Sequence, residues 1–142
     1  MKPLLLVCLI HLFSTTLLQA QFQSIVVHVS QIHPIEGELS VALYNKAADF
    51  PHHRKVYKAK TPKVNASTMS VRFDSLPQGT YAIAVYHDRN ANKKLDKNML
   101  GAPTEPYGFS NNARRLMSAP SFEESTIKLN GSTPYQTDIT LK

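Results

Sequence analysis

The sequence of 142 residues has one cysteine, no tryptophan and no window of ten residues with a helical hydrophobic stripe. A single cysteine cannot form an intramolecular disulfide, and Cys8 lies in an apolar N-terminal segment. If that segment is removed, the remaining chain has neither a thiol nucleophile nor a thiolate metal ligand. The missing helical periodicity argues against a helical bundle.

Charge is also missing from residues 3–20, which follow Lys2. A positive start, an apolar stretch from Leu4 to Phe13 and a small residue at Ala20 form the layout of a secretory signal peptide. The apolar stretch is shorter than the roughly 20 residues that span a bilayer. We therefore predict a signal peptide over residues 1–20 and an exported, periplasmic or extracellular protein with no transmembrane segment after cleavage.

Apolar and polar residues alternate with a period of two after residue 23, as they do in half-buried strands. For example, Ile25, Val27 and Val29 share one strand face. The ranges with this pattern are 24–30, 38–44, 69–73, 80–86, 125–129 and 135–141. They predict an all-β domain over residues 21–142, a single antiparallel β-sandwich of about seven strands. A small barrel is the alternative.

Two long connections, 46–68 and 87–124, interrupt the strand pattern, and a helical turn is expected only near residues 45–50. The first connection is cationic, which fits a solvated loop that protects a strand edge or a contact with an anionic partner. Its few aromatic residues give no stacking platform, so we expect no nucleic-acid partner. The cations are Lys46, Arg54, Lys55, Lys58, Lys60 and Lys63.

The second connection opens with oxygen-bearing side chains at loop positions 1, 3, 5 and 9, namely Asp88, Asn90, Asn92 and Asp96. A calcium loop needs this spacing because alternate side chains of a curled chain point at the ion, and the backbone carbonyl of position 7, here Lys94, completes the set. The spacing predicts a calcium site of weak affinity, with a dissociation constant on the order of 10⁻⁴ to 10⁻³ M.

This loop also departs from a complete calcium loop. Position 6 is Lys93 where a sharp turn favours glycine, and position 12 is Met99 where a bidentate glutamate is expected. Further oxygens would have to come from Glu105 or Asp74. The alternative is that the Asp and Asn side chains only fold the loop through Asx turns.

Polar and aromatic residues follow in a segment rich in proline and glycine. Tyr107, Phe109, Asn111 and Arg114 could line a pocket for a small ligand or a cell-envelope polymer. His87 beside Asp88 suggests a hydrolase, but neither an H-E-x-x-H pair nor a G-x-S-x-G elbow accompanies it. The residues therefore favour a binding role over catalysis.

Two stretches carry a resemblance to known proteins. The run F-x-x-L-P-x-G-x-Y at residues 73–81 resembles the strand–turn–strand signature of prealbumin-like, immunoglobulin-related modules. Residues 37–51, 73–114 and 120–124 together resemble the secreted bacterial family known as domain of unknown function 2141. That family commonly has glycine where this chain has Lys93. The resemblance implies a periplasmic or surface β-sandwich and implies no enzyme activity.

The leading hypothesis from the sequence is an exported, non-enzymatic β-sandwich module. Its loop at residues 88–96 would bind calcium and order the adjacent segment 101–115. The second hypothesis is a metal-free binder of a small ligand or envelope polymer, and a hydrolase using His87 and Asp88 comes last.

Overall fold

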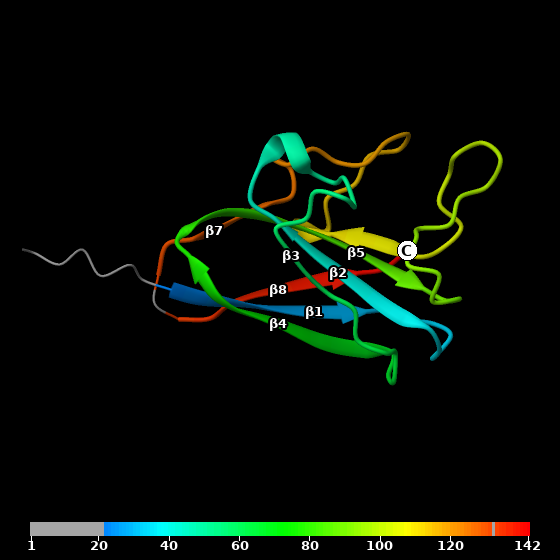
Figure 1. Cartoon of the computed structure of the whole chain (residues 1–142), viewed down its shortest axis with the longest axis horizontal. Coiled ribbons are helices and arrows are strands. Elements are labelled where there is room, and N and C mark those ends of the chain that lie inside the picture. Colours follow the sequence, from blue (N-terminus) through cyan, green and yellow to red (C-terminus); the bar gives the residue numbers. More distant parts are fainter. Residues whose placement is uncertain (1–21, 132) are drawn as a thin grey trace, which may run out of the picture.

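The computed structural model describes residues 22–131 and 133–142, so the predicted signal peptide at residues 1–20 lies outside the described residues. Two β-sheets pack face to face, with long loops on one side (Figure 1). The described chain contains eight strands and two short 3₁₀ turns, η1 (Ala47–Asp49) and η2 (Ser110–Asn112). The predicted all-β sandwich is confirmed.

The first sheet has three strands in the order β4-β1-β8. Strand β1 pairs antiparallel with β4 and parallel with β8, and this parallel pair is the one departure from the expected antiparallel arrangement among the described strands. The strands are β1 (Phe22–Ser30), β4 (Thr68–Pro77) and β8 (Tyr135–Thr140).

The second sheet has the order β3-β2-β5-β6, and β7 pairs with the first half of β5. Its strands are β2 (Glu38–Tyr44), β3 (Lys58–Lys60), β5 (Gly79–Asp88), β6 (Tyr107–Phe109) and β7 (Thr126–Leu129). Strands β3 and β6 lie inside the two predicted connections. Each has only three residues, too few to produce a readable alternation.

The inward faces of both sheets form the main core, as the alternation predicts. Ile25, Val27 and Val29 of β1 are fully buried, as are the inward residues of β2. Phe73 and Leu76 of β4 close the core at the tight turn into β5, where the Tyr81 hydroxyl donates to the Pro77 carbonyl oxygen at 2.8 Å. This turn passes the chain from one sheet to the other around a buried end.

A second apolar cluster covers the outer face of the five-stranded sheet. Here β5 presents Ala82 and Ala84, whose small side chains leave room for aromatic rings. The Phe50 ring meets Tyr44, Phe109 and Phe122 edge-on, with centroids 5.2, 5.7 and 5.9 Å apart. Edge-to-face pairs of this kind add stability beyond the area they bury. Strand β5 is consequently covered on both faces.

No helix in the described part of the chain is long and apolar enough to cross a bilayer.

We predict that Phe50→Ala destabilises the protein by about 3 kcal/mol or more, because it opens a cavity at the centre of the aromatic cluster. Phe22→Ala is the control, since Phe22 is 61% exposed and its loss should cost less than about 0.5 kcal/mol. Urea unfolding measures both variants. Equal midpoints for the two would show that the outer cluster does not hold the sheet.

Candidate functional site

The candidate calcium loop leaves the end of β5 and returns at β6, and it forms the yellow-green loop that projects from one end of the sandwich (Figure 1). The base of this loop is tightly packed. His87 and Asp88 are fully buried. The backbone of Asp88 lies opposite that of Glu38, at the start of β2, in the antiparallel β2–β5 ladder. The loop therefore starts from a fixed point in the core rather than from a frayed strand end.

The Asp88 carboxylate folds the first turn of the loop. Its Oδ1 accepts the backbone N–H of Asn92 at 3.1 Å, and its Oδ2 accepts the backbone N–H of Lys93 at 2.7 Å. Because Asp88 is buried, these two bonds replace the water that an ionised carboxylate requires. Asp88 is thus both the first predicted ligand and the anchor of the turn.

The other predicted side-chain ligands point toward one another. Asn90 and Asn92 each donate an amide N–H to Asp96, at 2.7 and 2.9 Å, one to each carboxylate oxygen. The Oδ1 atoms of both asparagines accept backbone N–H groups two residues ahead, at Asn92 and Lys94. These are Asx turns. The spacing thus brings the predicted residues together, and it also forms the turns of the metal-free alternative.

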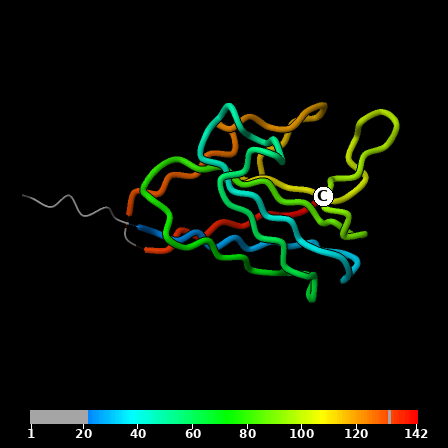
Figure 2. Tube along the Cα trace, viewed as in Figure 1, coloured from blue at the N-terminus to red at the C-terminus, as the bar shows by residue number. Residues whose placement is uncertain are grey.

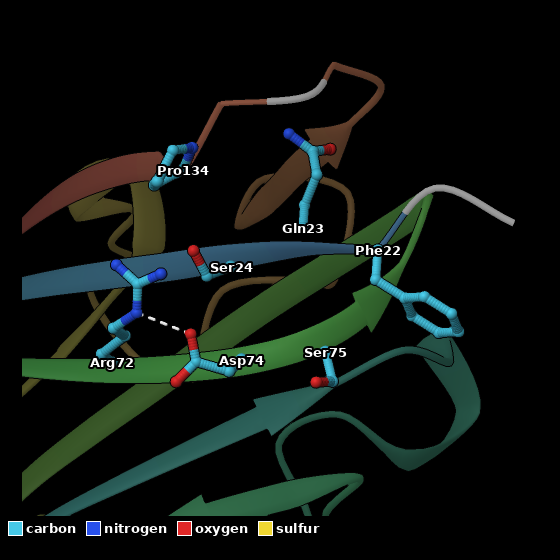
Figure 3. Close-up of a pocket in the computed structure, with 7 residues that line it drawn as sticks. All are labelled: Phe22, Gln23, Ser24, Arg72, Asp74, Ser75 and Pro134. Carbon is cyan, nitrogen blue, oxygen red and sulfur yellow. Dashed lines mark hydrogen bonds and ion pairs between the residues drawn. The ribbon is translucent and has the colours of Figure 1, made fainter.

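Glu105 joins this cluster, whereas Asp74 does not. The Glu105 carboxylate is 6% exposed and accepts the backbone N–H of Arg89 at 2.9 Å and that of Asp96 at 3.0 Å. It therefore ties the two ends of the loop together. Asp74 lies on β4 and pairs with Arg72, at the end of the sandwich where β1 begins (Figure 3). Of the two further oxygen donors suggested by the sequence, the structure places only Glu105 at the loop.

The three carboxylates of the loop have neutral partners only. Asp88, Asp96 and Glu105 accept hydrogen bonds from backbone N–H groups and asparagine amides. Among the described residues the ion pairs are Lys55–Asp49, Arg72–Asp74 and Arg115–Glu124, none of which involves this loop. The loop's own basic side chains are exposed to solvent. The negative charge inside the loop therefore has no cationic partner in the described chain.

Lys93 makes the turn for which glycine is expected. Its φ is +63°, in the left-handed region, and Ala91 has a φ of +54°. A side chain in this conformation costs roughly 1–2 kcal/mol, which the two hydrogen bonds to Asp88 offset. The departure from glycine thus leaves the sharp turn in place.

No group of three His, Cys, Asp or Glu side chains is arranged to hold a metal within residues 22–131 and 133–142. The predicted oxygen set differs from such a group, because it adds two amides and the Lys94 carbonyl to the carboxylates. Amide and carbonyl oxygens are ordinary calcium ligands.

The second predicted set does not form one surface. Phe109 is buried in the outer aromatic cluster, and the Asn111 amide donates to the carbonyls of Glu124 and Thr126 at 3.2 and 2.9 Å. The Tyr107 ring meets the Phe109 ring edge-on, with centroids 5.9 Å apart, and the Arg114 guanidinium lies 5.7 Å from the Tyr107 ring centroid. Phe109 and Asn111 thus hold the fold, and Tyr107 with Arg114 remains at the surface.

His87 has a structural partner. Its Nε2 lies 2.8 Å from the Glu36 carbonyl oxygen, and its buried Nδ1 has no hydrogen-bond partner among the described residues. A carbonyl accepts only, so Nε2 carries the proton. The hydrogen bond of the His87 ring thus goes to the β1–β2 connection and to none of the predicted loop ligands.

A surface pocket lies at the end of the sandwich where β1 begins (Figure 3). Arg72 and Asp74, two residues apart on β4, form an ion pair at 2.6 Å among its lining residues. None of the predicted ligand-binding residues lines it. The lining residues are Phe22, Gln23, Ser24, Arg72, Asp74, Ser75 and Pro134.

Two residues that support the site were missed by the sequence analysis. Gly37 has a φ of +70°, and a Cβ atom there would lie 2.2 Å from the Asp88 carbonyl oxygen. Ser110 is fully buried; its hydroxyl accepts the Ile83 N–H at 2.9 Å and donates to the Ser125 carbonyl. Gly37 could have been identified from the sequence, because it directly precedes a predicted strand. Ser110 could not, because a single serine does not indicate a buried hydrogen-bonding role.

Fold and loop together define an all-β sandwich with a carboxylate-folded loop at one end. A family model described as "Uncharacterized protein conserved in bacteria (DUF2141)" matches residues 27–136. The chain belongs to this family, as its sequence resemblance implied. Neither the curated proteins nor the solved structures compared with the chain include a match.

We predict that Gly37→Ala destabilises the protein by more than about 2 kcal/mol, because it combines left-handed strain with a clash against the β5 backbone. Gly101→Ala is the control: Gly101 also has a positive φ, +81°, but a Cβ atom there meets nothing within 4 Å. Thermal unfolding of both variants separates strain from the clash. Equal losses would contradict the close packing of Gly37 on β5.

We also predict that Lys93→Gly stabilises the protein by about 0.5–1 kcal/mol, because relief of left-handed strain exceeds the added entropy of the unfolded chain. Lys94→Gly removes the same charge without positive φ at that position and should destabilise by a similar amount. Urea midpoints of the two variants should therefore move in opposite directions. A shift of both in the same direction would contradict the strained turn.

Proposed function

We propose that this protein is an exported, non-enzymatic binding module whose loop at residues 88–96 binds calcium weakly. The ligands are the side chains of Asp88, Asn90, Asn92 and Asp96 and the backbone carbonyl of Lys94. Calcium binding orders the following segment, residues 101–115, which presents the binding face. The observation that carries this proposal is that the loop's three carboxylates have only neutral partners.

Electrostatics support a cation at this place. Asn92 links two of the carboxylates, because its backbone N–H bonds to Asp88 and its amide bonds to Asp96. Two negative groups held by one residue repel each other, and a hard divalent cation converts that repulsion into attraction. The amides of Asn90 and Asn92 carry an oxygen as well as a donor, so rotation of the side chain offers the oxygen to an ion beside Asp96.

Hydrogen bonds connect Asp96 to the segment that follows. The Asp96 carbonyl oxygen accepts the Thr104 N–H at 2.8 Å, and the Asp96 N–H donates to Glu105 at 3.0 Å. The next residue, Pro106, accepts the His87 N–H at 2.8 Å, beside β6. A cation that fixes Asp96 therefore also restrains residues 104–106 and the approach to Tyr107.

Location supports a weak site. The charge-free segment at residues 3–20 predicts export, and calcium outside the cytosol is abundant enough for extracellular modules that bind in the 10⁻⁴ to 10⁻³ M range.

We predict that about 10 mM calcium stabilises the protein by roughly 1.4–2.7 kcal/mol, the linkage expected for this affinity range. The melting temperature should rise by roughly 5–10 °C for a domain of this size. Differential scanning fluorimetry in calcium, with EDTA as the reference, measures the shift.

Asp96→Asn should abolish this shift, because it removes a ligand charge while retaining an oxygen. Asp138→Asn is the matched control: Asp138 is an exposed residue of β8, and its side chain makes no hydrogen bond with another described residue. This variant should keep the full calcium shift. Unchanged melting of the parent protein in millimolar calcium would reject the metal site and leave the Asx turns as the whole role of the loop.

A further inference from the structure

Four of the most exposed apolar side chains sit in two pairs of neighbouring residues. Met99 and Leu100 are 104% and 93% exposed, and Leu116 and Met117 are 97% and 92% exposed. Neither pair contributes to the two clusters of buried residues. Apolar side chains left outside both cores in this way indicate a contact with another apolar phase.

The two pairs project from loops that leave the same side of the five-stranded sheet. Residues 89–106 and 113–125 form the yellow-green and orange loops, which both extend away from the three-stranded sheet (Figures 1 and 2). Their bases touch, because Arg114 of the second loop lies on the Tyr107 ring and donates to the Tyr107 carbonyl oxygen at 3.4 Å. Tyr107 follows directly after the first loop.

The first pair is held outward by a closed turn. The Asn98 side-chain oxygen accepts the N–H groups of Leu100 and Ala102, both at 3.0 Å. The Asn98 backbone N–H also donates to the Ala102 carbonyl oxygen, and the Asn98 carbonyl oxygen accepts the Gly101 N–H, both at 2.9 Å. The second loop is fastened by the Arg115–Glu124 ion pair at 2.9 Å, and the Ser121 N–H donates to Glu124, which lowers the pKa of that carboxyl. Exposure of the two pairs is thus built into the loops.

Basic side chains outnumber acidic ones around the two pairs. The two loops, residues 89–106 and 113–125, contain six basic and four acidic side chains; of the acidic ones, Glu105 is buried and Glu124 is paired with Arg115. All six basic residues are exposed. Arg115 shares its charge with Glu124, and the rest lack a carboxylate partner among the described ion pairs. The basic residues are Arg89, Lys93, Lys94, Lys97, Arg114 and Arg115.

We propose that these two loops dock the protein onto the surface of a bilayer that contains anionic phospholipid. The apolar pairs at residues 99–100 and 116–117 enter the boundary between headgroups and acyl chains, while the basic side chains contact headgroup phosphates. Apolar tips with flanking Lys and Arg suit such an interface, since long basic side chains extend to the headgroups above the buried tip. A protein partner would instead favour one contiguous patch with few lysines.

This docking does not depend on the calcium proposal. The closed turn at Asn98 involves none of the predicted calcium ligands. Lys94 is the one residue that both proposals use, the calcium site through its backbone carbonyl and the docking surface through its side chain. The docking experiments are therefore run both in EDTA and in calcium, and binding in EDTA is the result that the proposal requires.

The absence of tryptophan from the sequence provides a site-specific test. Leu100→Trp introduces a single fluorophore at one tip, and Tyr57→Trp introduces one near Tyr81, toward the opposite end of β5. The full chain, as the cell processes it, is mixed with phosphatidylcholine vesicles that contain either none or about 30 mol% of phosphatidylglycerol. We expect a blue shift for Leu100→Trp only with the anionic vesicles, and no shift for Tyr57→Trp.

Vesicle co-sedimentation measures the contribution of each element. The double variant Met99→Ser with Leu100→Ser should bind anionic vesicles at least about tenfold more weakly. The triple variant Lys93→Gln, Lys94→Gln and Lys97→Gln should lose about tenfold or more. Ile35→Ser, at a half-exposed apolar residue outside both loops, should bind like the parent. Unchanged melting temperatures would show that the variants fold.

Besides a lack of vesicle binding in EDTA, three outcomes would overturn the proposal. One is the same emission from Leu100→Trp with and without anionic vesicles. Another is undiminished vesicle binding by the Met99→Ser and Leu100→Ser variant, which would mean that general positive charge or another segment binds the lipid. The third is concentration-dependent self-association that this variant abolishes, which would assign the tips to a second copy of the chain.

Discussion

Burial of strand β5 on both faces is the constraint on which the rest of the structure depends. Its inward residues, such as Ile83 and Val85, fill the space between the sheets, and its outward alanines accept the aromatic cluster. Along its edges β5 pairs with β2 on one side and with β6 and β7 on the other. Because β5 ends inside this packing, the loop that follows starts from a rigid base.

The loop after β5 holds its acidic side chains inside and its basic side chains outside, because the two kinds differ in length. This arrangement is why the same loop supports both the calcium proposal and the membrane proposal. The short carboxylates of Asp88 and Glu105 fit inside the turns and accept backbone N–H groups at close range. The long side chains of Lys93, Lys94 and Lys97 extend into solvent. The loop is thus negative inside and positive outside, which suits a small cation within it and an anionic surface against it.

Sequence analysis predicted local features well where neighbouring residues decide them. Alternation identified the inward faces of the longer strands, and the Asp–Asn spacing identified a loop that curls on itself. Local patterns did not give the structural contacts that a distant segment makes. Phe109 packs in the aromatic cluster and Asn111 donates to the carbonyls of Glu124 and Thr126, because residues 122–126 lie beside them. Strands β3 and β6 exist only through pairing with β2 and β5.

The sequence by itself determined the sandwich class, the curled loop at residues 88–96 and the family, because period-two patterns and short motifs fix local conformation and face. Only the tertiary structure decided that β8 lies parallel to β1, that Glu105 rather than Asp74 joins the loop, and that Gly37 must lack a side chain beside Asp88. Each of these depends on contacts between residues that are not neighbours in the chain, from nine residues apart for Asp96 and Glu105 to residues at opposite ends of the domain for β1 and β8. These contacts form, and stabilise the protein, only after the sheets have packed. A local sequence pattern therefore does not predict them.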